Sequence, residues 1–147
     1  MQLALRQPTR RTLKERPSRR SQVPDGSGLP VGSGTAVEGA GLYAQHCQAC
    51  HGVEGQGGVN DVLSGGHSTL ASSTPVKTVG SYWPYATTLF DYIRRAMPYT
   101  QPGALSSGQT YALTDYVLYV NGVITANKVI DHTSLAGIIM PNRDGFV

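Results

Sequence analysis

The sequence has few charged side chains, only two cysteines and no long apolar run. Charged residues make up 14% of the 147 residues, whereas glycine occurs 18 times. Two cysteines cannot build a framework of several disulfides, which excludes the disulfide-rich class of small secreted folds. No stretch approaches the roughly 20 apolar residues of a membrane-spanning helix, so we predict no membrane span. The length allows one domain of ordinary size.

Basic residues are concentrated at the N-terminus and are scarce elsewhere. Residues 1–20 contain seven arginines and lysines against one acid, whereas the rest of the chain contains five basic and eight acidic side chains. The net charge of +3 therefore belongs to a tail, and the body is acidic. A nucleic-acid interface needs basic and base-reading side chains on a folded element. The tail has neither, so we predict no binding to nucleic acid.

Composition divides the chain at about residue 35. Residues 1–34 are rich in Arg, Pro, Ser and Gly without apolar periodicity, which predicts a flexible basic tail or linker. We predict the folded domain over 35–147, with a C-terminal extension from about residue 122. No signal peptide is visible, because Arg6 and Pro8 interrupt the short apolar run at the start.

Three helices are predicted in this domain. Residues 36–49 lead directly into the two cysteines. Residues 85–96 carry an apolar stripe, and Pro98 ends this helix because proline cannot continue the hydrogen-bond ladder. Residues 107–120 repeat apolar side chains at helical spacing after a capping box that begins at Ser106.

The remaining segments predict loops. Residues 52–80 are rich in Gly, Ser and Thr, and a long irregular segment of this kind is uncommon unless it has a function or packs on a cofactor. A short helical turn is expected near 133–139, and no segment predicts a sheet. The fold class is therefore all-α, with three to four helices and long loops.

The chemistry is carried by the motif Cys47-Gln48-Ala49-Cys50-His51. Its spacing is that of haem attachment, C-x-x-C-H. Two thiols three residues apart can add to the two vinyl groups on one porphyrin edge, and the next residue places its imidazole under the ring. We therefore predict one covalent haem c with His51 bound to the iron. The second ring nitrogen of His51 should donate to a backbone carbonyl or a similar group, which fixes the tautomer.

Three other interpretations of the cysteine pair are weaker. A thioredoxin-like dithiol follows a strand in a βαβ unit, whereas Cys47 follows a predicted helix. A structural zinc site needs four ligands, and His67 and His132 are distant and unpaired. A disulfide between Cys47 and Cys50 would close a small, strained loop.

The candidates for the sixth ligand of the iron are the methionines and the histidines distant from the motif. Methionine is a common partner of histidine in cytochromes and raises the reduction potential. Met97 lies between two predicted helices, where packing can hold a ligand rigidly, whereas Met140 lies in a terminal loop. Met97 is therefore favoured, although either methionine can also fill a gap in the core. His67 and His132 remain bis-histidine alternatives.

A cluster of aromatic and basic residues lies before and within the second predicted helix. Arginine presents a fork of donors that suits carboxylates, so this cluster is a candidate for the haem edge and its propionates. It is equally explained as aromatic packing. The candidates are Tyr82, Trp83, Tyr85, Arg94 and Arg95.

From about residue 39 to residue 121 the chain resembles class I cytochromes c. The resemblance rests on residues spread over this range: Gly39, Tyr43, Cys47, Cys50, His51, Leu63 before a glycine loop, Met97-Pro98, Ala112 and Tyr116. It implies the class I cytochrome c fold around one haem. It also implies that the first helix packs on the last helix, that Leu63 belongs to the haem-binding residues, and that Met97 is the distal ligand.

A closer resemblance is to the cytochrome c subunits of Sox-type sulfane (sulfite) dehydrogenases. It rests on the unusual strings at 75–88, 91–98 and 140–146 and extends over roughly 24–147. It implies a periplasmic location, a molybdopterin-containing catalytic subunit that oxidises a sulfur compound, and a downstream cytochrome c acceptor. The chain would then be an electron-transfer subunit, not the catalytic chain. The alternatives are a freestanding soluble electron carrier, a haem protein with an open distal site, and an interaction module without haem.

Overall fold

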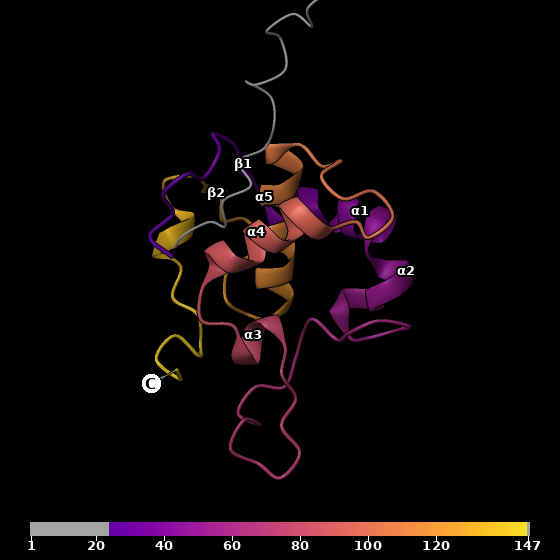
Figure 1. Ribbon diagram of the computed structural model, residues 1–147, viewed down its shortest axis with the longest axis vertical. Helices are drawn as coiled ribbons and strands as arrows, with labels where there is room; N and C mark the ends of the chain where they lie inside the picture. Colours follow the sequence, from indigo (N-terminus) through magenta and orange to yellow (C-terminus); the bar gives the residue numbers. More distant parts are fainter. Residues whose placement is uncertain (1–23, 147) are drawn as a thin grey trace, which may run out of the picture.

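The computed structural model describes residues 24–146, which form a mainly helical body with long loops (Figure 1). No helix within this range is long and apolar enough to cross a membrane. The all-α prediction is confirmed in its main features, and the last long helix has the predicted bounds. The helical elements are α1 (Ala36–His46), α2 (Gln48–His51), η1 (Val53–Gly55), α3 (Val79–Tyr82), α4 (Ala86–Ala96), α5 (Ser107–Val120) and η2 (Leu135–Gly137).

Helix α1 begins at a capping box and ends before the first cysteine. The Thr35 hydroxyl accepts from the Glu38 backbone N–H at 3.3 Å, and the Glu38 carboxylate accepts from the Thr35 N–H at 3.0 Å. Cys47 leaves the helical region with φ −125° and ψ −38°, so α2 starts as a separate turn. The predicted single helix over 36–49 is therefore two helices that meet at Cys47.

Helices α1 and α5 cross at Gly39. A Cβ atom at this position would lie 1.9 Å from the carbonyl oxygen of Ala112, so only glycine allows the two backbones to approach this closely. The rings of Tyr43 and Tyr116 pack beside the crossing with centroids 4.9 Å apart. The packing of the first helix on the last helix, which the cytochrome resemblance implied, is confirmed.

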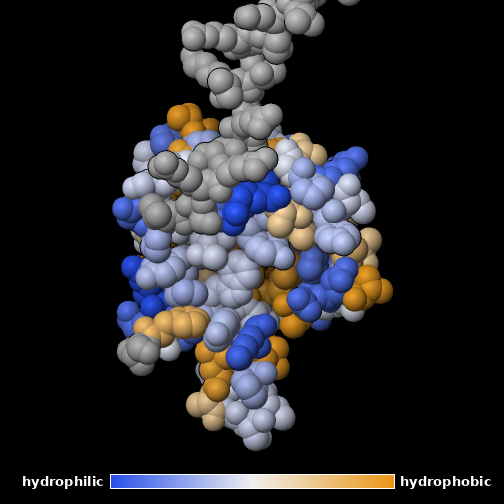
Figure 2. Space-filling view, in the orientation of Figure 1, coloured by the Kyte–Doolittle hydropathy of each residue, from blue (hydrophilic) through white to orange (hydrophobic). Residues whose placement is uncertain are grey.

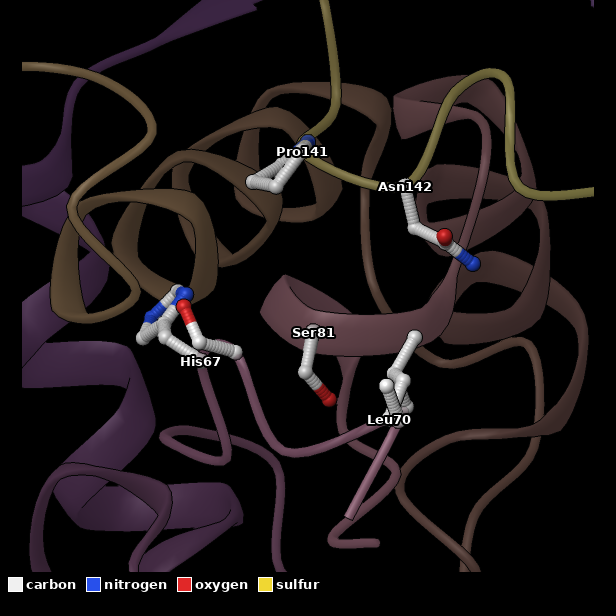
Figure 3. A pocket seen from close by; sticks show the side chains of 7 residues that line it. His67, Leu70, Ser81, Pro141 and Asn142 are labelled. Carbon is white, nitrogen blue, oxygen red and sulfur yellow. The ribbon is translucent and has the colours of Figure 1, made fainter.

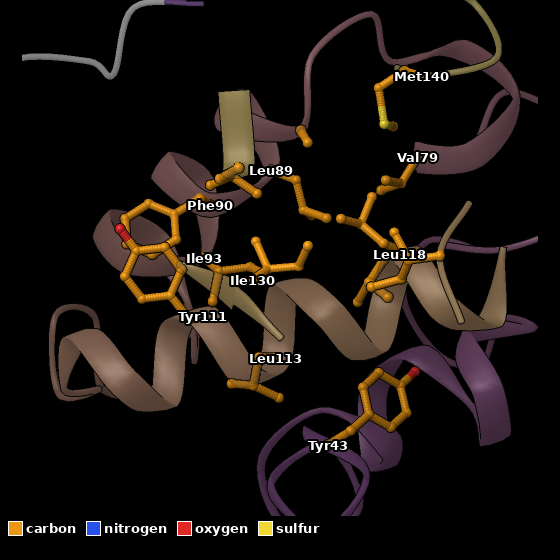
Figure 4. Close-up of a cluster of buried hydrophobic side chains, with 14 residues drawn as sticks. Tyr43, Val79, Leu89, Phe90, Ile93, Tyr111, Leu113, Leu118, Ile130 and Met140 are labelled. Atoms are coloured by element: carbon orange, nitrogen blue, oxygen red, sulfur yellow. The ribbon is translucent and has the colours of Figure 1, made fainter. Parts of the chain in front are cut away.

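The hydrophobic core lies mainly on the other side of α5. Phe90 of α4 packs on Tyr111 of α5 with ring centroids 4.5 Å apart. Figure 4 shows Tyr43 on one side of α5 and the side chains of α4 on the other. The predicted C-terminal extension contributes fully buried side chains to the same core, namely Ile130, Leu135 and Met140.

Residues before Thr35 pack against this body. Strand β1 (Ser33–Gly34) pairs antiparallel with β2 (Ile130–Asp131), and the Tyr111 hydroxyl donates to the Pro30 carbonyl at 2.7 Å. The folded part of the chain thus begins before Thr35. The sequence did not predict this, because the contacts use backbone groups of these residues, and backbone groups leave no pattern in the sequence. Residues 1–23 of the predicted tail lie outside the described residues. The expectation of no sheet is wrong for this two-residue pair.

The predicted irregular segment 52–80 is a long loop with η1 near its start and α3 at its end. Part of it projects from the bottom of the body in Figure 1. Asn121, the residue that follows α5, fastens the segment to that helix. Its amide donates to the carbonyl of Leu63 at 3.1 Å and to that of Val117 at 2.9 Å, and its side-chain oxygen accepts from Gly65 N–H at 3.2 Å.

Asp115 on α5 is a completely buried carboxyl group. Neither of its oxygens has a hydrogen-bond partner among the described residues. Burial raises its pKa to about 8; the nearby Ile130 backbone N–H acts to lower the pKa, and the Glu38 carboxylate adds a smaller raising effect. The folded protein therefore holds Asp115 protonated at neutral pH, whereas the unfolded chain ionises it above the ordinary pKa of 3.8.

Replacing Asp115 with asparagine should remove a pH dependence of stability. Between pH 4 and pH 8 the folded state keeps a proton that the unfolded state releases, so the free energy of unfolding should fall as pH rises and level off above pH 8. The slope for one such group is about 1.4 kcal/mol per pH unit at most. Urea titrations at pH 5 and pH 8 should show a smaller difference for Asp115→Asn than for the wild type. The exposed Asp144→Asn control should behave as wild type, and an unchanged slope in Asp115→Asn would refute the assignment.

Candidate functional site

The two cysteines occupy the first turn after α1. Cys47 is half-buried at the edge of the core, Cys50 is exposed, and both are free thiols. The N–H groups of Cys50 and His51 donate to the Cys47 carbonyl at 3.1 and 3.0 Å. The motif is therefore folded as one compact helical turn, with the imidazole directly after the second thiol.

The loop after the motif folds back on it through backbone hydrogen bonds. Gly52 ends α2 with φ +79°, and a Cβ there would lie 2.2 Å from the carbonyl oxygen of Gly57. Gly57 N–H donates to the His51 carbonyl at 2.8 Å, and Asn60 N–H donates to the Cys50 carbonyl at 2.9 Å. These contacts fix the backbone on which the cysteines and the histidine stand.

The His51 ring is oriented by the same loop. Its Nδ1 lies 2.7 Å from the backbone carbonyl oxygen of Asp61, a geometry in which Nδ1–H donates. The predicted bond from the second ring nitrogen to a backbone carbonyl is confirmed. This bond places the proton on Nδ1 and leaves the lone pair of Nε2 available to a metal ion.

The structure favours neither a reactive dithiol nor a zinc site at the motif. Burial, with a further contribution from the nearby Cys50, raises the pKa of the Cys47 thiol to about 11. Dithiol oxidoreductases depend on the opposite, a lowered thiol pKa that supplies a thiolate. Within residues 24–146 no group of three or more His, Cys, Asp or Glu side chains is placed to hold a metal ion.

The two candidate methionines lie in different environments. Met140 is 1% exposed inside the core, and Figure 4 shows its sulfur near Val79. Met97 follows the last residue of α4 and is half-buried at the margin of the core. Met140 is therefore enclosed in the core, whereas Met97 lies at its margin and is only partly buried.

The other candidate residues lie around the same margin or next to it. Leu63 and Trp83 are half-buried against the core, and Trp83 meets Tyr92 edge-on with centroids 6.0 Å apart. Arg95 pairs with Asp91 at 2.6 Å, whereas Arg94 makes no ion pair within the described part of the chain. Of the two arginines, Arg94 is therefore the one whose guanidinium group is left to bind a further carboxylate.

This set of donors fits a covalently attached haem. Two free thiols stand on one turn, the oriented imidazole of His51 would offer Nε2, and the side chain of Met97 lies at the core margin. Several apolar side chains there are only half-buried against the core, as expected of residues that would also contact a porphyrin. The partly buried hydrophobic side chains packed on the core are Leu29, Leu42, Cys47, Leu63, Trp83, Met97, Leu105, Tyr116, Val123 and Ile138, and this set includes the predicted site residues Leu63, Trp83 and Met97.

A separate hollow contains the alternative ligand His67. It has a volume of about 360 Å³ and is lined by His67, Ser68, Leu70, Ala71, Ser81, Pro141 and Asn142. Figure 3 shows His67 and Leu70 from the long loop, Ser81 from α3, and Pro141 and Asn142 from the C-terminal segment. None of the motif residues lines this hollow. His132, the other alternative, is half-buried with a buried Nδ1 that has no hydrogen-bond partner among the described residues.

Comparison with known proteins identifies one matching family and two similar proteins. The family model described as cytochrome c matches residues 36–121. The thiosulfate dehydrogenase of Psychrobacter arcticus is 28% identical over 109 residues, which are 71% of this chain and 33% of that protein. The sulfane dehydrogenase SoxCD of Paracoccus pantotrophus has a solved chain that is 41% identical, with a TM-score of 0.84, over 86% of this chain and 63% of that chain.

These comparisons confirm the fold and both resemblances. The match to the solved structure extends well beyond the 36–121 range of the family model. The chain spans about a third of the thiosulfate dehydrogenase and less than two thirds of the sulfane dehydrogenase chain. The similarity therefore concerns one part of larger proteins.

Proposed function

The chain belongs to the cytochrome c family, and from this premise we propose that it carries single electrons on one haem c attached at Cys47 and Cys50. The observation that carries the proposal is the oriented His51, whose Nδ1 is held by the Asp61 carbonyl and whose Nε2 is left for iron. His51 and Met97 would be the two axial ligands. The donor set and its half-buried apolar margin support this assignment.

The haem, when bound, supplies a one-electron couple between ferrous and ferric iron. The chain's own residues would hold and tune it. Cys47 and Cys50 would anchor the porphyrin edge, and the Asp61 carbonyl, 2.7 Å from His51 Nδ1, would keep the His51 ring in one tautomer and orientation. The Met97 thioether would raise the reduction potential and fill the position at which a substrate or gas would otherwise bind. Leu63 and Trp83 would exclude water, and Arg94 would bind a propionate.

We further propose a role in the oxidation of sulfur compounds. Both relatives are named as dehydrogenases of such compounds, a sulfane dehydrogenase and a thiosulfate dehydrogenase. In this role the chain is the electron-accepting subunit beside a molybdopterin-containing catalytic subunit in the periplasm, and it passes electrons to a downstream cytochrome c. The alternative is a freestanding electron carrier without a molybdenum partner, since the chain corresponds to only part of each relative.

Purification from the native host through a tag on this chain tests the role. We expect a molybdenum-containing protein to co-purify, and sulfite or thiosulfate to reduce the haem within the complex. The separated chain should show no such reduction, because it carries no catalytic centre of its own. A haem-containing chain that purifies alone and is never reduced by these compounds would support the freestanding carrier instead.

A further inference from the structure

A short turn of the long loop, residues 63–65, is fastened to three different elements. From η1, the Gly55 carbonyl accepts from the Leu63 N–H at 2.7 Å. From α3, the buried Thr78 hydroxyl at the N-cap donates to the Gly65 carbonyl at 2.7 Å. The third contact comes from the end of α5. We call residues 63–65 the 63–65 turn.

Asn121 makes the contact from α5, and it holds the 63–65 turn at both ends. Its Nδ2 donates to the Leu63 carbonyl at 3.1 Å, and its Oδ1 accepts from the Gly65 N–H at 3.2 Å. Nδ2 also donates to the Val117 carbonyl at 2.9 Å, which fixes the orientation of the amide. Because a side-chain amide offers two donors and an acceptor, one residue can make all three bonds.

Ending the helix does not by itself require the Asn121 side chain. Residue 121 has φ −91° and ψ 1°, whereas the left-handed conformation that follows the helix is adopted by Gly122, with φ +72°. The Asn121 side chain is instead enclosed, since the residue is 4% exposed. A Cβ at Gly80 of α3 would lie 2.2 Å from Asn121 Oδ1, so α3 packs directly on the amide.

Beyond the 63–65 turn, the loop is closed by contacts within itself. The Thr69 hydroxyl donates to the Gly66 carbonyl at 2.6 Å and accepts from the Val76 N–H at 2.9 Å. Residues 71–77 are exposed, and Figure 2 shows the loop projecting below the body with a mostly pale surface at its tip. Leu63, by contrast, packs half-buried at the margin of the core. Asn121 thus fastens the part of the loop that carries a candidate haem contact, and Thr69 fastens the part that does not.

We propose that Asn121 is a positioning residue for electron transfer, which holds the 63–65 turn so that the Leu63 side chain covers the haem edge and excludes water. This rests on the proposed function, in which Leu63 is one of the apolar residues around the haem. The access of water to a haem is one of the factors that set its reduction potential. Water stabilises the ferric form, because that form carries one more positive charge. A loosened 63–65 turn should therefore lower the potential.

Asn121→Leu tests the proposal, because leucine has a similar shape but no donor, no acceptor and no charge. In a redox titration of the holoprotein, the equilibrium with a fixed mediator should shift about threefold to tenfold toward the ferric form. A tenfold shift corresponds to a fall of about 59 mV for one electron. Thr69→Val is the matched control, since it also removes polar contacts from this loop without a change of charge. Its shift should stay below about 1.5-fold.

Amide hydrogen exchange of the reduced holoprotein, followed by NMR, gives an independent readout. In Asn121→Leu the Gly65 amide loses its acceptor and should exchange roughly tenfold faster or more. In Thr69→Val the Val76 amide should exchange faster, and the Gly65 amide should not. Gly80→Ala displaces the Asn121 side chain without replacing it, so it should move the potential and the Gly65 exchange in the same direction as Asn121→Leu.

The two readouts separate a positioning role from a purely structural one. An unchanged potential in Asn121→Leu and Gly80→Ala, even with faster exchange at Gly65, would overturn the proposal and leave Asn121 a structural residue. Equal shifts of the potential in Asn121→Leu and Thr69→Val would overturn it as well. A wild-type chain without c-type haem would instead overturn the proposed function.

Discussion

Replacing Met97 with alanine should leave the haem covalently attached but remove the sixth ligand from the iron. The ferric protein should lose the weak absorption band at about 695 nm that accompanies methionine ligation, and its reduction potential should fall. The reason is positional, since Met97 lies half-buried at the margin of the core, whereas Met140 is enclosed within it. Absorption spectra and a redox titration of the purified variant provide the measurement.

Met140→Ala is the matched control for Met97→Ala. Met140 is 1% exposed within the core, so its loss should leave the 695 nm band intact while a cavity lowers the free energy of unfolding by roughly 2–5 kcal/mol. The two variants should therefore separate ligation from packing. Loss of the band in Met140→Ala together with its retention in Met97→Ala would reverse the assignment of the distal ligand.

Replacing Gly39 with alanine should produce a large loss of stability. The new Cβ would lie 1.9 Å from the Ala112 carbonyl oxygen and 2.7 Å from the Tyr116 Cβ, so α1 and α5 must move apart. Overpacking of this kind costs roughly 1–3 kcal/mol and occasionally more, and contact with backbone places Gly39→Ala at the upper end. Chemical denaturation of the holoprotein gives the free energy of unfolding.

Gly41→Ala makes the same substitution two residues away on the same helix. A Cβ at Gly41 meets nothing within 4 Å, so this variant should be stabilised by up to about 1 kcal/mol through helix propensity. If Gly39→Ala is as stable as Gly41→Ala, the close crossing of α1 and α5 is not what holds these helices together.

The sequence was most informative where a residue type has one chemical or steric use. The spacing of Cys47, Cys50 and His51 predicted a haem-attachment motif, and in the structure these residues lie on one turn. The capping box at Ser106 and Gln109 and the apolar spacing after it predicted the bounds of α5. The resemblance pointed to Gly39 at the helix crossing, where the steric requirement for glycine is now explicit.

The sequence was least informative where the backbone alone makes the contact. The Asp61 carbonyl that orients His51 would be available from almost any residue type, so nothing at position 61 reveals it. The strands β1 and β2 are two residues long, too short for an alternating pattern. Asn121 carries no sequence signal for its role, since its contacts with Leu63 and Gly65 join segments more than 50 positions apart.

The central claim is that Cys47 and Cys50 hold one haem by two thioether bonds. A pyridine haemochrome spectrum of the chain, purified from a host that can attach haem c, tests it most directly. The account predicts the α-band position of a c-type haem with both vinyl groups saturated, at a ratio of one haem per chain. A b-type spectrum with extractable haem, or protein that folds without any haem, would contradict it.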